Sequence, residues 1–310
     1  MRFPQMNDKH VTIKKPAQLL PGDTIGVVAP AGPFDPELFQ NGIAALEAMG
    51  YRVFQPEGLT LRDRFLAGSD QHRADLINQL FADPGIKGVF CARGGYGSLR
   101  LLDLIDYDLI WQNPKVFIGF SDISALIWVL MERSGLVAFH GPVITTLGKG
   151  NAETAASLTA ALTSGTPMEI PASNTEVIRA GKCNGTVRGG NLATLCHLTG
   201  TPYTPEFKGS IAVLEDVGEA PYKIDRMLCQ MRMAGCFDGI AGLALGTFAD
   251  CGDINDVLDV FKDVFRDIDI PILAGFDIGH GPVNLTLPMG IQSTLDTERR
   301  TLSYTETALL

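Results

Sequence analysis

The sequence predicts a two-domain α/β protein whose first domain is a doubly wound parallel sheet with helices on both faces. At 310 residues the chain exceeds the usual size of a single hydrophobic core, which favours two domains. In the first half, short apolar runs alternate with helical patterns, as expected for βαβ units. A polar, glycine-containing stretch near the middle interrupts this alternation and is typical of a joint between domains.

The elements of the first half follow one another at short intervals. TIGVVAPAGP (24–33) predicts a buried strand that ends in a Pro/Gly turn. Asp35 fits a helix N-cap, Pro36 the first helical position and Gly50 the stop, so a helix is expected between them. The series continues with strands and helices at 51–54, 69–83, 87–92, 98–105, 116–118, 123–130 and 135–143. Such a series predicts a parallel sheet covered on both sides.

The second half is again a mixture of strand and helix patterns, for example SIAVLED (210–216) and INDVLDVFKDVF (254–265). We therefore expect a first domain at 15–150, a linker at 151–182 with one short helix, and a smaller α/β domain at 183–310.

Composition excludes several classes of protein. The net charge of −10 argues against nucleic-acid binding, which needs clustered Lys and Arg. No apolar run is long enough for a membrane span, and the N-terminus lacks the apolar core of a signal peptide. The six cysteines form no CxxC pair and no metal-ligand spacing, which indicates reduced thiols. A cytoplasmic protein without a metal site is expected.

The stretch GFSD (119–122) lies where an apolar strand gives way to a helix, and it allows two interpretations. Ser121 could simply cap the helix, since serine is favoured at that position. Alternatively, the sharp strand-to-helix turn could present its hydroxyl at the top of the sheet as a nucleophile, although Ile123 departs from the G-x-S-x-G pattern.

The glycine-rich turn RGGYG (93–97) follows another predicted strand and is equally open. Its glycines could serve only to allow positive φ in a tight turn. The spacing matches neither the Rossmann nor the Walker motif, so nucleotide binding is not predicted. A sharper hypothesis is that a glycine amide of this turn joins the amide of Asp122 in binding an oxyanion.

A serine nucleophile needs a base, and the tetrapeptide HGPV supplies two candidates because it occurs at 140–143 and again at 280–283. The pattern alone does not choose between His140 and His280. Structural roles are expected for the other three histidines, His10, His72 and His197. The carboxylates that could orient the base are Glu215, Asp216, Glu219 and Asp277.

Several longer motifs give the chain a resemblance to the LD-carboxypeptidase family of serine peptidases, which includes the microcin C self-immunity proteins. They are GVVAPAGP, ARGGYGSLRLL, IGFSDISAL, FHGPV, GGNLATL, LEDVGEAPYKIDRML, GTFADC and ILAGFDIGHGPVNLTLPMG, and they occur in the expected order over about residues 20–292. The resemblance implies a first domain similar to class I glutamine amidotransferases and a smaller α/β second domain.

The resemblance also implies a Ser–His–Glu triad divided between the two domains. Ser121 matches the nucleophile, His280 the base and Glu215 the acid that orients it. The backbone amides of Gly95 and Asp122 match the oxyanion donors.

The implied reaction is removal of the terminal D-alanine from murein tetrapeptides during cell-wall recycling, by a homodimer that needs no cofactor. Arg93 and Arg188 are candidates for binding the substrate carboxylate, because a guanidinium binds carboxylates in a bidentate manner. Two alternatives stay open: an immunity-type peptidase that cleaves a peptidyl or aminoacyl nucleotide, and a non-catalytic two-domain protein that binds a small molecule.

Overall fold

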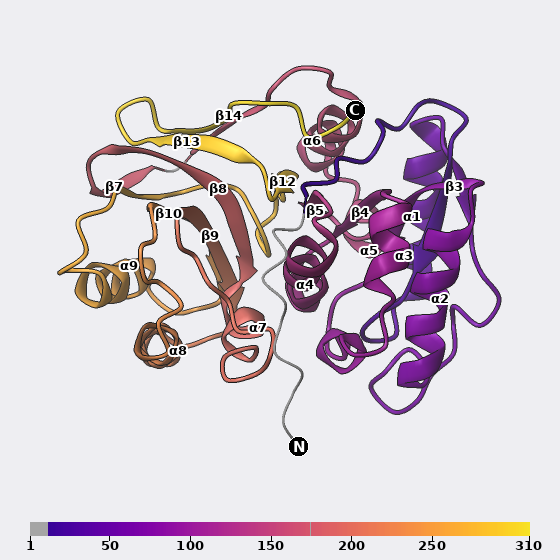
Figure 1. The fold of residues 1–310 in the computed structure, drawn as a ribbon, viewed down its shortest axis with the longest axis horizontal. Coiled ribbons are helices and arrows are strands. Elements are labelled where there is room, and N and C mark those ends of the chain that lie inside the picture. Colours follow the sequence, from indigo (N-terminus) through magenta and orange to yellow (C-terminus); the bar gives the residue numbers. More distant parts are fainter. Residues whose placement is uncertain (1–11, 174) are drawn as a thin grey trace.

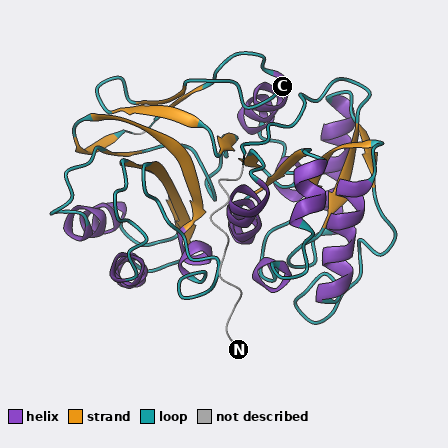
Figure 2. Cartoon of the chain, in the orientation of Figure 1, coloured by secondary structure: helices purple, strands orange, loops and turns teal. Residues whose placement is uncertain are grey.

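The computed structural model describes residues 12–173 and 175–310, which form two β-sheets placed side by side and flanked by helices (Figure 1). Colouring by secondary structure shows strands and helices intermixed in both halves (Figure 2), as predicted for a mixed α/β protein. Each helix in the described part of the chain is too short or too polar to cross a membrane.

The first sheet has the strand order β12-β5-β4-β3-β1-β2. Its strands are β1 (Thr24–Val28), β2 (Arg52–Phe54), β3 (Ile86–Cys91), β4 (Val116–Gly119), β5 (Ala138–His140) and β12 (Leu287–Met289). All neighbours pair in parallel except β12, which is antiparallel to β5. The strand order reverses at β1, and ligands of such sheets bind beyond the carboxyl ends of the strands at that point.

The helices of the first half pack against this sheet, and α4 lies between it and the second sheet (Figure 1). They are α1 (Pro36–Ala48), α2 (Asp70–Ala82), α3 (Tyr107–Gln112), α4 (Ser124–Ser134), α5 (Ile144–Leu147) and α6 (Ala152–Thr163), with 3₁₀ turns η1 (Ser98–Leu101) and η2 (Ser121–Ile123). The predicted start of α1 is confirmed, because the Asp35 side chain accepts a hydrogen bond from Leu38 N–H and Pro36 is the first helical residue.

The helix expected over 98–105 is wrong beyond its first turn. Only η1 forms there, and the regular helix α3 begins later, behind the N-cap Asp106. One long-range and one local contact accompany this difference: Ser98 N–H donates to the Asp122 side chain, and the Tyr107 hydroxyl donates to Leu102 O. The first contact fixes the start of this segment against the turn at Ser121.

The second sheet has the strand order β6-β14-β13-β8-β9-β10-β11-β7. Its strands are β6 (Glu169–Pro171), β7 (Glu176–Arg179), β8 (Lys182–Asn191), β9 (Ser210–Val217), β10 (Gly242–Ala249), β11 (Ile272–Ala274), β13 (Gln292–Asp296) and β14 (Thr301–Tyr304). The helices of this half are α7 (Leu192–Cys196), α8 (Pro221–Met233) and α9 (Ile254–Val264). Figure 1 shows α8 and α9 together on one side of this sheet.

Residues 151–182, expected as the linker, contain α6 and the two edge strands β6 and β7 of the second sheet. The division at 150 and 183 stays a prediction.

Two features connect the sheets and position the site. Helix α4 lies between them (Figure 1), and its buried Trp128 packs edge-on against Phe207 at a centroid distance of 5.2 Å. In addition, the chain leaves the second sheet at β11 and returns to the first at β12, where Leu287 pairs with His140. The intervening segment therefore spans from one sheet to the other, and it carries His280.

Candidate active site

Ser121 lies at the sharp turn between β4 and α4, as the sequence predicts. Its φ of +64° is unusual for a residue other than glycine and is the kind of local strain often found at functional sites. It does not cap a helix: Phe120 occupies the N-cap position of η2, and Ile123 that of α4. The hydroxyl is directed to a histidine instead.

Ser121, His280 and Glu215 form one continuous chain of polar contacts. Ser121 Oγ lies 3.1 Å from His280 Nε2, and His280 Nδ1 lies 2.7 Å from Glu215 Oε2. Glu215 is fully buried near the end of β9. A carboxylate beside Nδ1 favours the tautomer with the proton on that nitrogen, which leaves Nε2 free to accept a proton from the serine.

The loop that carries His280 is held closely around Glu215. Gly279 has φ +99°, and a Cβ at this position would collide with Glu215 Oε2. Its N–H donates to Asn284 Oδ1 at 2.9 Å, while Asn284 N–H donates to Thr154 Oγ1 on α6 at 3.0 Å. These contacts fix the position from which His280 reaches the serine.

His140, the other candidate base, lies on the opposite side of the same carboxylate. Its Nε2 is 3.9 Å from Glu215 Oε1, and its ring is completely buried at the end of β5. Burial lowers the pKa of His140 to about 4, although the Glu215 charge acts in the opposite direction. His140 is therefore neutral at pH 7.

The remaining histidines lie elsewhere or outside the described residues. His72 Nε2 is 3.1 Å from Gly58 O, and His197 is the C-cap residue of α7. His10 lies outside the described residues.

The other three candidate carboxylates have contacts with residues other than His280. Asp216 accepts hydrogen bonds from Asn191 and Ala193 at the start of α7, and burial raises its pKa to about 6. Glu219 forms an ion pair with Lys223, at 3.2 Å. The backbone carbonyl of Asp277 accepts from Leu285 N–H, which stabilises the loop around His280.

The glycine-rich turn at 93–97 packs directly against the serine. A Cβ on Gly94 would lie 2.9 Å from Ser121 Cβ, so this approach requires glycine. Gly95 has φ +116° and lines the same cleft as Ser121. Within the described part of the chain, no acceptor is found for the N–H of Gly95 or of Asp122.

Two side chains hold the glycine-rich turn in place, and sequence reasoning missed both of them. The buried Asp122 carboxylate accepts from Ser98 N–H at 2.7 Å, and the buried Arg73 guanidinium donates to Gly97 O at 3.1 Å. Burial raises the pKa of Asp122, while its hydrogen bonds act in the opposite direction. The only feature of the sequence that points to these supporting contacts is the Asp that directly follows the serine.

The triad opens into a cleft of about 690 Å³ that contains Ser121, Gly95 and His280. Arg93 lines this cleft and donates to Pro33 O at 2.6 Å. Arg188, the other predicted carboxylate-binding residue, is not among the lining residues. It pairs with Glu132 and lies over the Trp128 ring, which accounts for its charge without a substrate.

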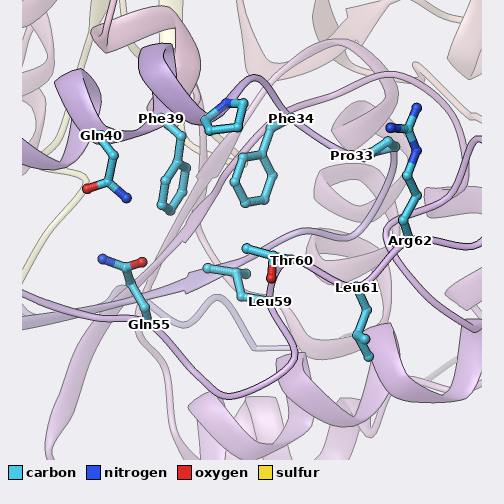
Figure 3. A pocket seen from close by; sticks show the side chains of 10 residues that line it. Pro33, Phe34, Phe39, Gln40, Gln55, Leu59, Thr60, Leu61 and Arg62 are labelled. Atoms are coloured by element: carbon cyan, nitrogen blue, oxygen red, sulfur yellow. The ribbon is translucent and has the colours of Figure 1, made fainter.

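A separate, more apolar pocket of about 210 Å³ lies near the start of α1. Figure 3 shows the rings of Phe34 and Phe39 side by side in this pocket, facing Leu59. None of the triad residues lines it, so the chemistry belongs to the larger cleft.

Proteins similar to this chain carry peptidase names. A Bacillus subtilis protein described as a "Probable murein peptide carboxypeptidase" is 35% identical over 297 residues, covering 93% of each chain. The "Murein tetrapeptide carboxypeptidase" of Pseudomonas aeruginosa is 32% identical over 291 residues, covering 89% of this chain and 94% of that relative.

The "Microcin C7 self-immunity protein MccF" of Escherichia coli is also similar, at 29% identity over 94% of this chain and 95% of the relative. A solved structure of MccF without ligand superposes with a TM-score of 0.88 at 28% identity, covering 96% of this chain and 100% of that chain. This match confirms the mixed α/β, two-sheet architecture. The specific similarity to glutamine amidotransferases stays a prediction.

Two family models match consecutive parts of the sequence. The LD-carboxypeptidase N-terminal domain matches residues 25–141, and the LD-carboxypeptidase C-terminal domain matches residues 184–295. Together they cover more than half of the chain, and the resemblance inferred from the motifs is thereby confirmed. The chain belongs to the LD-carboxypeptidase family of peptidases.

Proposed function

We propose that this chain is a serine carboxypeptidase that hydrolyses the bond before the terminal D-alanine of murein tetrapeptides. The observation that carries the proposal is the unbroken contact chain from Ser121 through His280 to Glu215. The names of the relatives support the substrate class, since two of them are described as acting on murein peptides.

Ser121 Oγ attacks the carbonyl carbon of the scissile bond while His280 Nε2 takes its proton. Glu215 holds the imidazole in the required tautomer and stabilises its cationic form. The imidazolium then donates the proton to the departing amine of D-alanine. Water, activated by the same histidine, hydrolyses the acyl-enzyme and regenerates Ser121.

The developing oxyanion is bound by the N–H groups of Gly95 and Asp122. One such donor contributes a factor of about 10²–10³ to kcat. Arg93, which lines the cleft beside Gly95, is the group proposed to bind the α-carboxylate that a carboxypeptidase substrate must carry.

Mass spectrometry of L-Ala-D-Glu-(meso-diaminopimelate)-D-Ala tests this function. Loss of one alanine is expected with the parent protein and not with Ser121→Ala. An intact tetrapeptide after prolonged incubation with folded parent protein contradicts the proposal.

The similarity to MccF supports a second candidate, a peptidase acting on an aminoacyl nucleotide. Other solved MccF structures hold aspartyl sulfamoyl adenosine or glutamyl sulfamoyl guanosine. A base-binding pocket usually offers aromatic side chains for stacking, whereas Phe120 is the one aromatic residue among those lining this cleft. Parallel turnover assays with aspartyl sulfamoyl adenosine and the tetrapeptide distinguish the two substrates.

The non-catalytic alternative is tested by active-site labelling. A fluorophosphonate is expected to modify Ser121, whereas a protein that only binds a small molecule would not react. We also propose a cytoplasmic homodimer. Cell fractionation and light scattering test these two points separately.

A further inference from the structure

We infer that His140 is a positioning residue that holds the second oxygen of the Glu215 carboxylate, opposite His280. This inference rests on the proposed function and identifies a role for the first of the two HGPV tetrapeptides. The three residues come from different parts of the fold: β5 ends at His140, β9 carries Glu215, and the segment after β11 carries His280.

The two histidines face different oxygens of one carboxylate. His280 Nδ1 lies 2.7 Å from Oε2, and His140 Nε2 lies 3.9 Å from Oε1. The second distance is about 1 Å longer than an ordinary N–H···O hydrogen bond. A shift of about 1 Å would therefore bring the second pair to hydrogen-bonding distance.

The polar atoms on this side of the carboxylate have no other partner. Glu215 Oε1 and both ring nitrogens of His140 are buried without a hydrogen bond to any described residue. Buried polar groups are nearly always hydrogen-bonded, because burying them unpaired is unfavourable. A hydrogen bond between His140 Nε2 and Glu215 Oε1 would satisfy one unpaired atom of each residue.

A neutral His140 can donate a hydrogen bond to the Glu215 carboxylate. A neutral imidazole carries one N–H, and an anionic carboxylate can only accept. The titratable groups that face the ring are Glu215 and His280. With Nε2 protonated, His140 donates to Oε1 without adding a second cation beside His280.

His140 is well placed to orient Glu215 and badly placed to touch substrate. Its ring is fully buried and is not among the residues lining the cleft. The Phe120 ring stands beside both imidazoles, with centroids 4.8 Å from His280 and 6.0 Å from His140. Holding both oxygens prevents rotation of the carboxylate and keeps His280 aligned with Ser121.

The kinetic test compares His140→Phe, which lacks the donor, with His140→Asn and His140→Gln, which retain an N–H. We expect kcat of His140→Phe to fall about 10- to 100-fold with KM nearly unchanged, as for groups that orient a metal ligand through a second hydrogen bond. At least one amide variant should recover most of that loss. His197→Gln, at the C-cap of α7, is the matched control and should retain parental kinetics. Equal kcat for the parent and a folded His140→Phe overturns the inference.

A spectroscopic test does not depend on activity. With ¹⁵N-labelled histidine in the Ser121→Ala background, His140 should show a slowly exchanging Nε2–H resonance, assigned by its loss in His140→Gln. Glu215→Gln should shift that resonance, because it changes the charge of the acceptor. A His140 resonance that exchanges rapidly, or that ignores Glu215→Gln, overturns the inference.

The two tests separate the inference from the proposed function. If the tetrapeptide stays intact but the resonance responds to Glu215→Gln, the function fails and the contact stands. If the parent cleaves the tetrapeptide and the resonance does not respond, the inference alone fails.

Discussion

Ser121 Oγ and His280 Nε2 lie 3.1 Å apart, although 159 positions of sequence separate them. The serine belongs to a turn of the first sheet, and the histidine to the segment that passes from the second sheet to the first. The contact therefore exists only when both halves are folded and correctly placed.

Removing either partner of this contact should abolish turnover. Because triad members act as a unit, Ser121→Ala and His280→Ala should each lower kcat by about 10⁴-fold or more, while the circular dichroism spectrum stays unchanged. His72→Ala changes a histidine that contacts Gly58 instead and should retain activity. A His280→Ala variant with parental kcat would remove this residue from the mechanism.

Gly94 should tolerate no side chain. In Gly94→Ala the new Cβ would lie 2.9 Å from Ser121 Cβ and 3.1 Å from Oγ, so the serine or the turn must move. We expect kcat/KM to fall at least tenfold, since small displacements of reacting groups are costly. Gly165→Ala, where a Cβ meets no atom within 4 Å, is the matched control and should be neutral. Equal kinetics for both variants would show that the turn is not tightly packed on Ser121.

The Asp122 carboxylate should support oxyanion binding through the turn that it anchors. Asp122→Ala removes the acceptor for Ser98 N–H, which frees the loop carrying Gly95, and kcat should fall with little change in KM. Asp122→Asn keeps a carbonyl oxygen for the same N–H and should retain most of the activity. Equal steady-state kinetics for Asp122→Ala and Asp122→Asn would show that the hydrogen bond from Ser98 N–H to residue 122 does not support catalysis.

Arg93 should determine affinity for the free carboxylate of the substrate. A hydrogen bond to a charged group contributes about 1.5–3 kcal/mol, so Arg93→Ala should raise KM by about 10- to 100-fold. Arg188→Ala removes a guanidinium already paired with Glu132 outside the cleft and should leave KM unchanged. The reverse ranking of the two variants would place the carboxylate site at Arg188.

The pH dependence of stability should report the buried His140. Its pKa falls from 6.5 to about 4 on folding, so below pH 6.5 the unfolded chain binds a proton that the native chain does not. His140 therefore leaves the free energy of unfolding unchanged well above pH 6.5, and it lowers that free energy as the pH falls from 6.5 towards 4. Between pH 7 and pH 5 the loss is about 2 kcal/mol.

Asp216 has the opposite effect in the same range. Burial raises its pKa from 3.8 to about 6, so its protonation stabilises the native state as the pH falls. The parent curve alone is thus uninformative, and the comparison must be made with His140→Phe. Urea unfolding should show that this variant loses about 2 kcal/mol less than the parent on acidification from pH 7 to pH 5. If the free energy of unfolding of the parent and of His140→Phe falls equally between pH 7 and pH 5, His140 titrates normally in the native state.

Local patterns in the sequence predict much of the first sheet and the turn at Ser121. The N-cap of α1 and the change from strand to helix after Gly119 are determined by residues close together in the sequence, and both are observed. The helix expected over 98–105 does not form beyond one 3₁₀ turn, and the contact that fixes its start joins Ser98 N–H to Asp122, which is remote in the sequence. No local pattern contains that contact.

The choice of base shows the same limit in the site. His140 and His280 begin identical tetrapeptides, so neither composition nor spacing distinguishes them. What differs is the oxygen of Glu215 that each one faces and the contact with Ser121, which is recorded for His280, and both are properties of the assembled sheets. Arg188 is a plausible carboxylate-binding residue in the sequence for a similar reason, since its partner Glu132 lies on α4, more than fifty positions earlier.

The return of the chain to β12 has a consequence for dividing the protein into fragments. A polypeptide ending near residue 150 would contain the nucleophile but would leave β5 as an unprotected sheet edge, open to aggregation. The complementary fragment would carry both the histidine and the strand that covers this edge. Reassembly of such fragments would restore the sheet and the hydrolytic centre in a single event, so recovered catalysis could serve as a readout of fragment complementation.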